Sequence, residues 1–130
     1  MSNGMDWSLY PNFARFEFEC RHSGLCDMQP EFMERLQALR TEYGKPMQIN
    51  SGYRHWTHPV EAKKGHRNGE HVQGMSADIG IANPDAYRLL ALAVKHGFTR
   101  IGVSQSGKGG RFIHLGLGAA GLPEPALWSY

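Results

Sequence analysis

A single carboxylate interrupts the most regular strand pattern of this chain. In residues 76–81, SADIGI, apolar side chains alternate with small or polar ones, so Ala77, Ile79 and Ile81 share one face of a predicted strand. Asp78 falls on the opposite face. A carboxylate buried there without a partner would cost on the order of several kcal/mol. A cation close to Asp78 would remove this cost.

Two helices are predicted on either side of this strand. The first spans residues 30–44, with Pro30 in its first turn and Gly44 as its stop. The second begins at Asn83 as N-cap, has Pro84 in its first turn and ends at Gly97. The first helix carries its apolar residues at helical spacing on one face, and these are Phe32, Met33, Leu36, Leu39 and Tyr43.

Short strands and loops account for the remainder of the sequence. PMQINSGYR, RIGV and RFIHLGL are predicted strands, the last two joined by the turn SQSGKGG, and RFEFEC alternates like another short strand. Residues 55–69 are predicted to form a long polar loop, and the tail GLPEPALWSY an irregular segment whose aromatics seal the core. The pattern predicts an α+β fold: a small mixed or antiparallel sheet with flanking helices, in a single domain over residues 1–130 with an N-terminal arm at 1–15.

Composition excludes several classes of function. Apolar residues make up 41% of the chain and charged residues 20%, as in ordinary globular proteins. A net charge of +2, with EAKKGHR as the one locally basic stretch, argues against a nucleic-acid partner. No apolar run reaches the roughly 18–20 residues that span a bilayer. The start MSNGMDWSLYPNF lacks the features of a secretory signal, so we expect synthesis in the cytoplasm and delivery by other means.

Two cysteines lie six positions apart, at Cys20 and Cys26. They can be free thiols or a disulfide across a short loop, and zinc ligation together with His22 is a third reading. No strong zinc-finger spacing supports that third reading, so a structural or incidental role is favoured.

Three side chains stand out among the seven histidines and twelve acidic residues of the chain. His71 ends the long loop, Asp78 interrupts its strand, and His114 lies on the strand face opposite to Ile113 and Leu115. Two imidazoles and one carboxylate form the three-ligand set of a catalytic zinc site, which leaves a fourth position open for water. The alternative is that these are scattered polar residues with no common role.

Four motifs in this order resemble a known family. SGYR, HVQGMSAD, GFTRIGV and RFIH look like the zinc D-alanyl-D-alanine carboxypeptidases and related peptidoglycan endopeptidases. The similarity is greatest to the small peptidases of tailed phages and prophages, and it runs from about Phe16 to Tyr130. It implies a hedgehog/DD-peptidase fold, with a small antiparallel sheet that holds a metal in a groove.

The resemblance also assigns roles to residues. His71, Asp78 and His114 match the zinc ligands, and Arg54 matches the arginine that contacts the substrate near the scissile bond or at its terminal carboxylate. A guanidinium fork suits a carboxylate or a developing oxyanion. The alternative for Arg54 is a structural salt bridge. Ser51 and Tyr53 are expected to shape the turn and to pack.

The sequence departs from the family where a catalytic carboxylate is expected. Several relatives place Asp or Glu three residues before the last histidine, where this chain has Arg111, and many others carry His-x-Asp, where it has Gly116. Glu70 is a candidate substitute, although a simple exposed loop residue is the favoured reading. His58 and His66 are further candidates, and Glu61 has no assigned role.

These patterns lead to three functional hypotheses. The first is a zinc metallopeptidase that cuts D-alanine-containing or stem-peptide bonds of peptidoglycan, in phage lysis or in local wall opening by a phage tail. The second is a catalytically silent domain of a phage particle that binds zinc or peptidoglycan, which the absent carboxylate favours. The third is a relative that uses the same metal site on a peptide from outside the wall.

Overall fold

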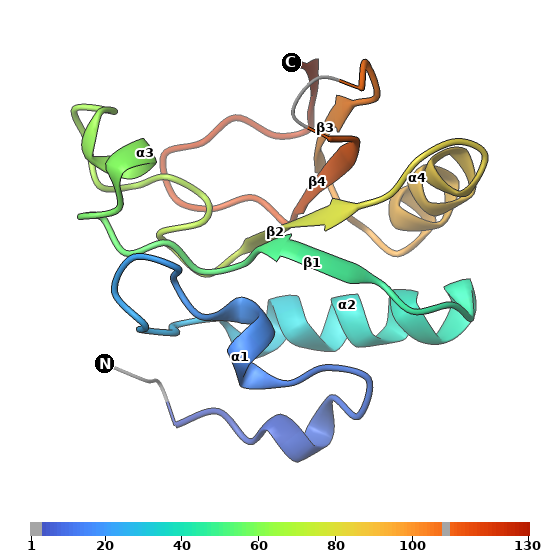
Figure 1. The fold of residues 1–130 in the computed structure, drawn as a ribbon, viewed down its shortest axis with the longest axis horizontal. Coiled ribbons are helices and arrows are strands. Elements are labelled where there is room, and N and C mark those ends of the chain that lie inside the picture. Colours follow the sequence, from blue (N-terminus) through green and yellow to red (C-terminus); the bar gives the residue numbers. More distant parts are fainter. Residues whose placement is uncertain (1–3, 108–109) are drawn as a thin grey trace.

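The computed structural model describes residues 4–107 and 110–130 and has an α+β fold built on one sheet. The sheet has five strands in the order β1-β2-β4-β3-β5. Figure 1 shows helix α2 running along the sheet, between β1 and the N-terminal segment, with α4 on the right, opposite α3. The element bounds are η1 Trp7–Leu9, α1 Arg15–Phe18, α2 Pro30–Tyr43, β1 Gln48–Ser51, α3 Pro59–Ala62, β2 Ser76–Gly80, α4 Asp85–Lys95, β3 Arg100–Ser104, β4 Phe112–Gly116 and β5 Ala126–Ser129.

Helix α2 confirms its prediction from periodicity. It begins at Pro30 and ends at Tyr43, and Gly44 adopts the left-handed conformation with φ of 78° that terminates helices. Its apolar stripe is buried as expected, at Phe32, Met33, Leu36, Leu39 and Tyr43. This stripe belongs to the same core as the apolar face of the sheet, to which Ala77, Ile79, Ile113 and Leu115 contribute.

Strand β2 lies inside the sheet, between β1 and β4, and fixes the register of the candidate ligands. It pairs antiparallel with β1 on one side and with β4 on the other. Asp78 of β2 and His114 of β4 are direct cross-strand partners. Since side chains alternate along a strand, Asp78 and His114 share one face, and Ile79 and Ile113 share the core face.

Three predicted features of the local structure were wrong. RFEFEC forms the helical turn α1 instead of a strand, and the Glu17 carboxylate closes this turn by accepting from the Ala14 N–H at 2.9 Å. The loop at 55–69 contains the short helix α3, which His58 caps through its ring nitrogen. Helix α4 begins at Asp85 because Asn83 and Pro84 occupy the turn closed by the hydrogen bond from Ala86 N to Ala82 O, at 2.9 Å.

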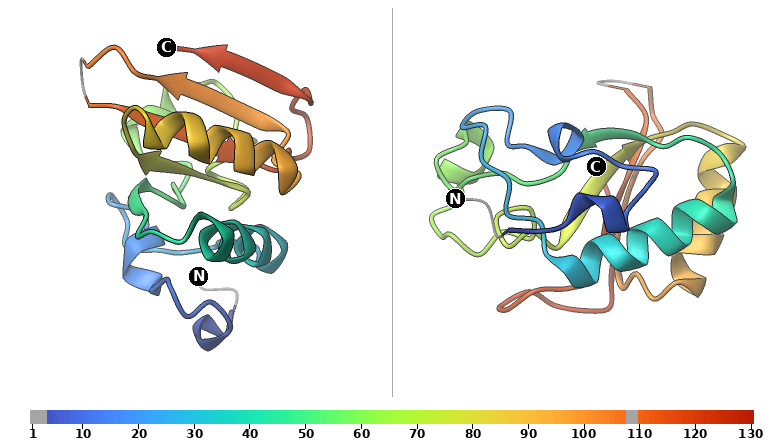
Figure 2. Two further views of the ribbon diagram at one scale, coloured as in Figure 1. Left: turned by 90° about the vertical axis from the view of Figure 1, so that its right-hand side faces the viewer. Right: turned by 90° about the horizontal axis from the view of Figure 1, so that it is seen from below.

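The C-terminal tail was also predicted wrongly. It forms strand β5, which pairs in parallel with β3, in the register Gly102 with Trp128. Figure 2 shows this strand at the edge of the sheet, next to β3. The turn SQSGKGG cannot be compared in full, since residues 108 and 109 lie outside the described residues. Within the described part of the chain, no helix combines the length and apolar character needed to cross a membrane.

Candidate metal centre

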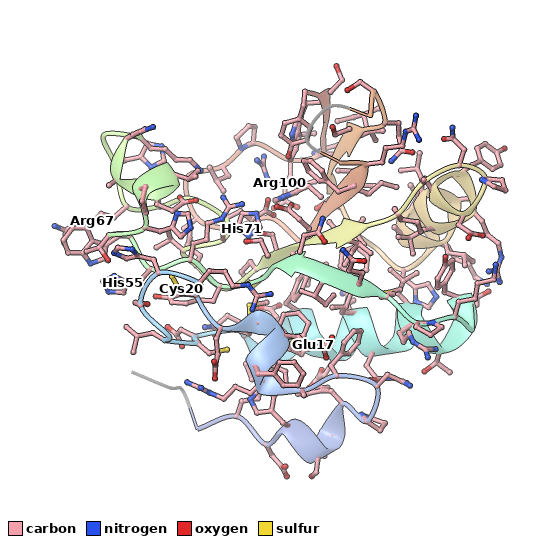
Figure 3. All side chains as sticks on the ribbon, in the orientation of Figure 1. Glu17, Cys20, His55, Arg67, His71 and Arg100 are labelled. Carbon is pink, nitrogen blue, oxygen red and sulfur yellow. The ribbon has the colours of Figure 1, made fainter. Side chains whose placement is uncertain are left out.

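The fold brings His71, Asp78 and His114 together on the face of the sheet opposite to the core, which α2 and α4 cover. Their ligand atoms all lie within 4.8 Å of one another, and all three residues are buried. His71 Nε2 is 3.5 Å from one Asp78 carboxylate oxygen, and His114 Nδ1 is 3.0 Å from the other. Figure 3 shows the labelled His71 side chain near the middle of the molecule. The residues predicted from sequence as a metal set therefore converge on one point.

The orientation of the His71 ring is fixed by the backbone. Its Nδ1 is 2.7 Å from the carbonyl oxygen of Gly52. A carbonyl only accepts hydrogen bonds, so Nδ1 carries the proton and Nε2 keeps its lone pair toward Asp78. This is the arrangement by which outer hydrogen bonds orient a metal-binding histidine.

The spacing between His71 and Asp78 depends on a tight turn at Gly74. Gly74 N donates to His71 O at 3.2 Å, and the residue has a φ of 69°, a region that favours glycine. A Cβ on Gly74 would overlap the Asp27 carbonyl oxygen and lie 3.0 Å from the Met28 Cα. A glycine at position 74 is therefore required both by conformation and by space.

The pKa shifts of His71 and Asp78 suit a divalent cation, because they favour a neutral imidazole and an ionised carboxylate. Burial lowers the pKa of His71. Burial alone would raise the pKa of Asp78, but its contacts with the imidazoles of His114 and His71 outweigh it and hold that pKa well below its usual range. Burial acts to lower the pKa of His114, yet its hydrogen bonds to Asp78 and Glu70 raise it. An ionised carboxylate between two imidazoles is a donor set that fits zinc.

Arg54 lies beside this group but is held by other side chains. Its Nε donates to Ser51 Oγ at 3.1 Å, Nη1 to Glu61 at 3.0 Å and Nη2 to Asp78 at 3.2 Å. These contacts match the salt-bridge alternative, and Arg54 also lines the cavity described below. Its role toward a substrate stays a prediction.

Glu61 is a residue of the site that the sequence did not assign. Its side chain is almost fully buried and pairs with Arg54 and with Lys64. Burial opposes ionisation, but the hydrogen bonds from Arg54 and Lys64 prevail and lower the pKa of Glu61. Glu61 thus keeps Arg54 in place next to Asp78.

Removing this charge is expected to destabilise the protein. We predict that Glu61→Gln lowers the free energy of unfolding by about 1–3 kcal/mol, because a charged hydrogen bond between the buried Glu61 and the partly buried Arg54 is lost. Glu42→Gln is the matched control, since Glu42 pairs with Lys95 and His96 at the surface. It should leave the urea midpoint nearly unchanged. Equal shifts in the two midpoints would contradict the account of Glu61.

The ligand atoms face a cavity of about 510 Å³. Its lining includes Lys64, His66 and Leu122, together with Trp128 of β5 and Tyr130, which follows that strand. The Trp128 ring lies 5.1 Å from that of His114, centre to centre. The tail aromatics were expected to seal the core, but they form a wall of the cavity instead. Gly102 permits this, since a Cβ there would come within 2.6 Å of the Trp128 ring.

Glu70 is not the exposed loop residue that the sequence favoured. It is buried, and its Oε1 lies 2.7 Å from His114 Nε2 and 3.1 Å from Arg100 Nε. Its Oε2 accepts from the Gly118 N–H at 3.1 Å. Glu70 therefore touches the His114 nitrogen opposite to the one that faces Asp78.

The other candidate groups lie apart from the three ligands. Cys20 and Cys26 are buried and not joined by a disulfide, and neither belongs to the metal group. The ring of His22 faces that of His58 at 6.1 Å. His58 uses its Nδ1 to cap α3. Figure 3 shows Cys20 and His55 toward the left of the molecule, away from Arg100.

Comparison with known proteins agrees with this geometry. The family model described as Peptidase M15 matches residues 11–116, which include all three candidate ligands. A search of curated proteins gives no match. Strand β5 with Trp128, and Tyr130 after it, lie beyond the matched residues. The chain therefore belongs to the peptidase M15 family, the zinc metallopeptidase family of the D-alanyl-D-alanine carboxypeptidases.

Proposed function

We propose that this chain is a zinc-dependent peptidase that hydrolyses peptide bonds in bacterial peptidoglycan, either at D-alanyl-D-alanine or elsewhere in the stem peptide. The observation that carries the proposal is the position of the three ligand atoms, which face a cavity instead of a closed core. A zinc site with three protein ligands and access to solvent is typical of catalysis. The choice of a wall substrate, and of a phage or prophage setting, rests on the motif resemblance described above.

The residues of the cavity have separate tasks in this mechanism. His71, Asp78 and His114 would hold the zinc ion, which when bound polarises a carbonyl and lowers the pKa of water. The Gly52 carbonyl keeps His71 in the tautomer that binds metal. Arg54 adds a positive charge at the cavity wall, where a substrate carboxylate or developing oxyanion would be stabilised.

The group that accepts the proton of the attacking water must differ from the one in relatives that carry a carboxylate at the position of Arg111 or Gly116. Arg111, at one of the two family positions, donates to the Gln105 carbonyl, and Gly116 at the other has no side chain. Both oxygens of Glu70 already accept hydrogen bonds. His66 lines the cavity and lies outside the metal group, so it is the side chain to test as the proton acceptor.

The second candidate function is a silent domain that binds zinc or wall peptides. Among the described residues that line the cavity, the carboxylates are Glu70 and Asp78, and both are hydrogen-bonded to His114. This favours the silent domain, because neither carboxylate is free to accept a proton from water. The two functions predict different products from the same substrate. A silent domain binds a stem peptide and leaves it intact.

The test is hydrolysis of defined substrates by the zinc-loaded protein. A synthetic stem pentapeptide ending in D-alanyl-D-alanine and purified peptidoglycan are incubated with the protein, and new amino groups are measured. Mass spectrometry then identifies the bond. We expect cleavage that a chelator stops and added zinc restores. A peptide of L-residues alone serves as the substrate control, and its exclusive cleavage would support a substrate from outside the wall.

The aromatic wall of the cavity is expected to contribute to substrate binding. We predict that Trp128→Ala raises KM about tenfold, equivalent to about 1.4 kcal/mol, because a peptide loses an apolar surface beside His114. Leu127→Ala is the matched control, since Leu127 is the exposed neighbour on the same strand. It should leave KM unchanged. The same KM in both variants would show that Trp128 does not contribute to substrate binding.

A further inference from the structure

The carboxylate of Glu70 fills the space that a side chain at position 116 would take. We propose that Glu70 is the positioning residue that holds the His114 ring in the orientation for metal binding. Glycine at position 116 leaves the space that the Glu70 carboxylate needs. The inference deepens the proposed function, since it rests on the same metal centre. In this role Glu70 orients the His114 ring and does not accept the proton of the attacking water.

The contacts of Glu70 support this assignment. Its Oε1 is 2.7 Å from His114 Nε2, and the His114 Nδ1 faces Asp78 at 3.0 Å. A carboxylate that accepts from Nε2–H fixes the tautomer whose Nδ1 lone pair can bind a metal. It also increases the basicity of that nitrogen. Glu70 thus holds the His114 ring at Nε2, and the ring directs Nδ1 toward the other two ligands.

Glu70 is itself held rigidly. Arg100 Nε donates to it at 3.1 Å, and the Gly118 N–H donates at 3.1 Å. Arg100 comes from the start of β3 and also donates to the Pro123 carbonyl in the tail. Side chains locked in this way keep an outer carboxylate at the precision that a metal site needs.

The register of β4 explains why residue 116 is glycine. Residues 114 and 116 point to the same face of the strand, so a side chain at 116 would lie beside the His114 ring. A Cβ built on Gly116 would overlap the Glu70 carboxylate, and Glu70 Oε1 would lie 2.6 Å from it. A carboxylate from the loop and a carboxylate from the strand therefore exclude one another. This chain uses the loop carboxylate.

The test is zinc affinity, measured by competition with a chromophoric chelator, together with the absorption spectrum of the Co²⁺-loaded protein. We expect Glu70→Ala to weaken zinc binding by about 10–100-fold and to change the cobalt spectrum. Glu70→Gln, which keeps the shape and one acceptor, should lose less. Adding Gly116→Asp to Glu70→Ala should recover most of the lost affinity, because it restores a carboxylate from the strand.

Two outcomes would overturn the proposal, and neither depends on catalysis. Zinc affinity and cobalt spectra that are unchanged in folded Glu70→Ala and Glu70→Gln would overturn it. A loss of affinity that Gly116→Asp does not recover would overturn the pairing of residues 70 and 116. If Glu70→Ala does not fold, the comparison of wild type, Glu70→Gln and the double variant still measures the effect. Normal zinc affinity without peptide cleavage in the wild type would instead refute the proposed function alone.

Discussion

His71→Ala is expected to lose stoichiometric zinc binding and to lower the rate of stem-peptide hydrolysis by about 10³-fold or more. His71 supplies one of the three ligand atoms that lie within 4.8 Å of one another. Two remaining ligands bind zinc far more weakly, and the group that activates the carbonyl is lost with the metal. Zinc content after dialysis and single-turnover hydrolysis measure the two effects.

His22→Ala is the control for this variant. His22 is exposed and lies outside the metal group, next to the pair Cys20 and Cys26. The control should keep full zinc content and full activity. If His22→Ala lost the metal and His71→Ala kept it, zinc would belong to the cysteine segment, and the account of the site would be wrong.

Gly74→Ala is expected to destabilise the fold by about 2–5 kcal/mol. A non-glycine residue at a φ of 69° costs roughly 1–3 kcal/mol, and the overlap of the new Cβ with the Asp27 carbonyl adds an overpacking cost of similar size. The hydrogen bond from Gln29 N to Gly74 O ties the same turn to the start of α2, at 3.0 Å. Urea unfolding of the metal-free protein measures the loss.

Gly65→Ala separates the two causes. Gly65 has the same φ of 69°, but a Cβ there meets nothing within 4 Å. It should therefore cost only the conformational part, about 1 kcal/mol. Equal losses at positions 65 and 74 would contradict the packing argument for the turn between His71 and Asp78.

The parts of the fold that could be predicted from sequence are those that local patterns determine. The stripe of α2 and the alternation in β2 each follow from one segment, and both were predicted with their buried faces. Strand β5 could not be predicted, because its partner β3 lies some two dozen residues earlier and the segment has little alternation of its own. The turn α1 depends on a hydrogen bond from Ala14 to Glu17 that competes with strand pairing.

The candidate site shows the same division. His71, Asp78 and His114 could be selected because zinc restricts its ligands to a few residue types, and the strand pattern placed two of them on one face. The roles of Glu61 and Glu70 could not be assigned, since each depends on an arginine that reaches it from another segment, Arg54 and Arg100. The nearest signal in the sequence was the glycine at 116, where relatives carry a carboxylate.

X-ray absorption spectroscopy of the zinc-loaded wild type tests the central claim most directly. The account predicts one zinc ion per chain with nitrogen and oxygen neighbours at about 2.0–2.2 Å, including the scattering pattern of two imidazoles. Sulfur neighbours at about 2.3 Å, or a first shell without imidazole, would contradict the assignment of His71, Asp78 and His114 as the zinc ligands.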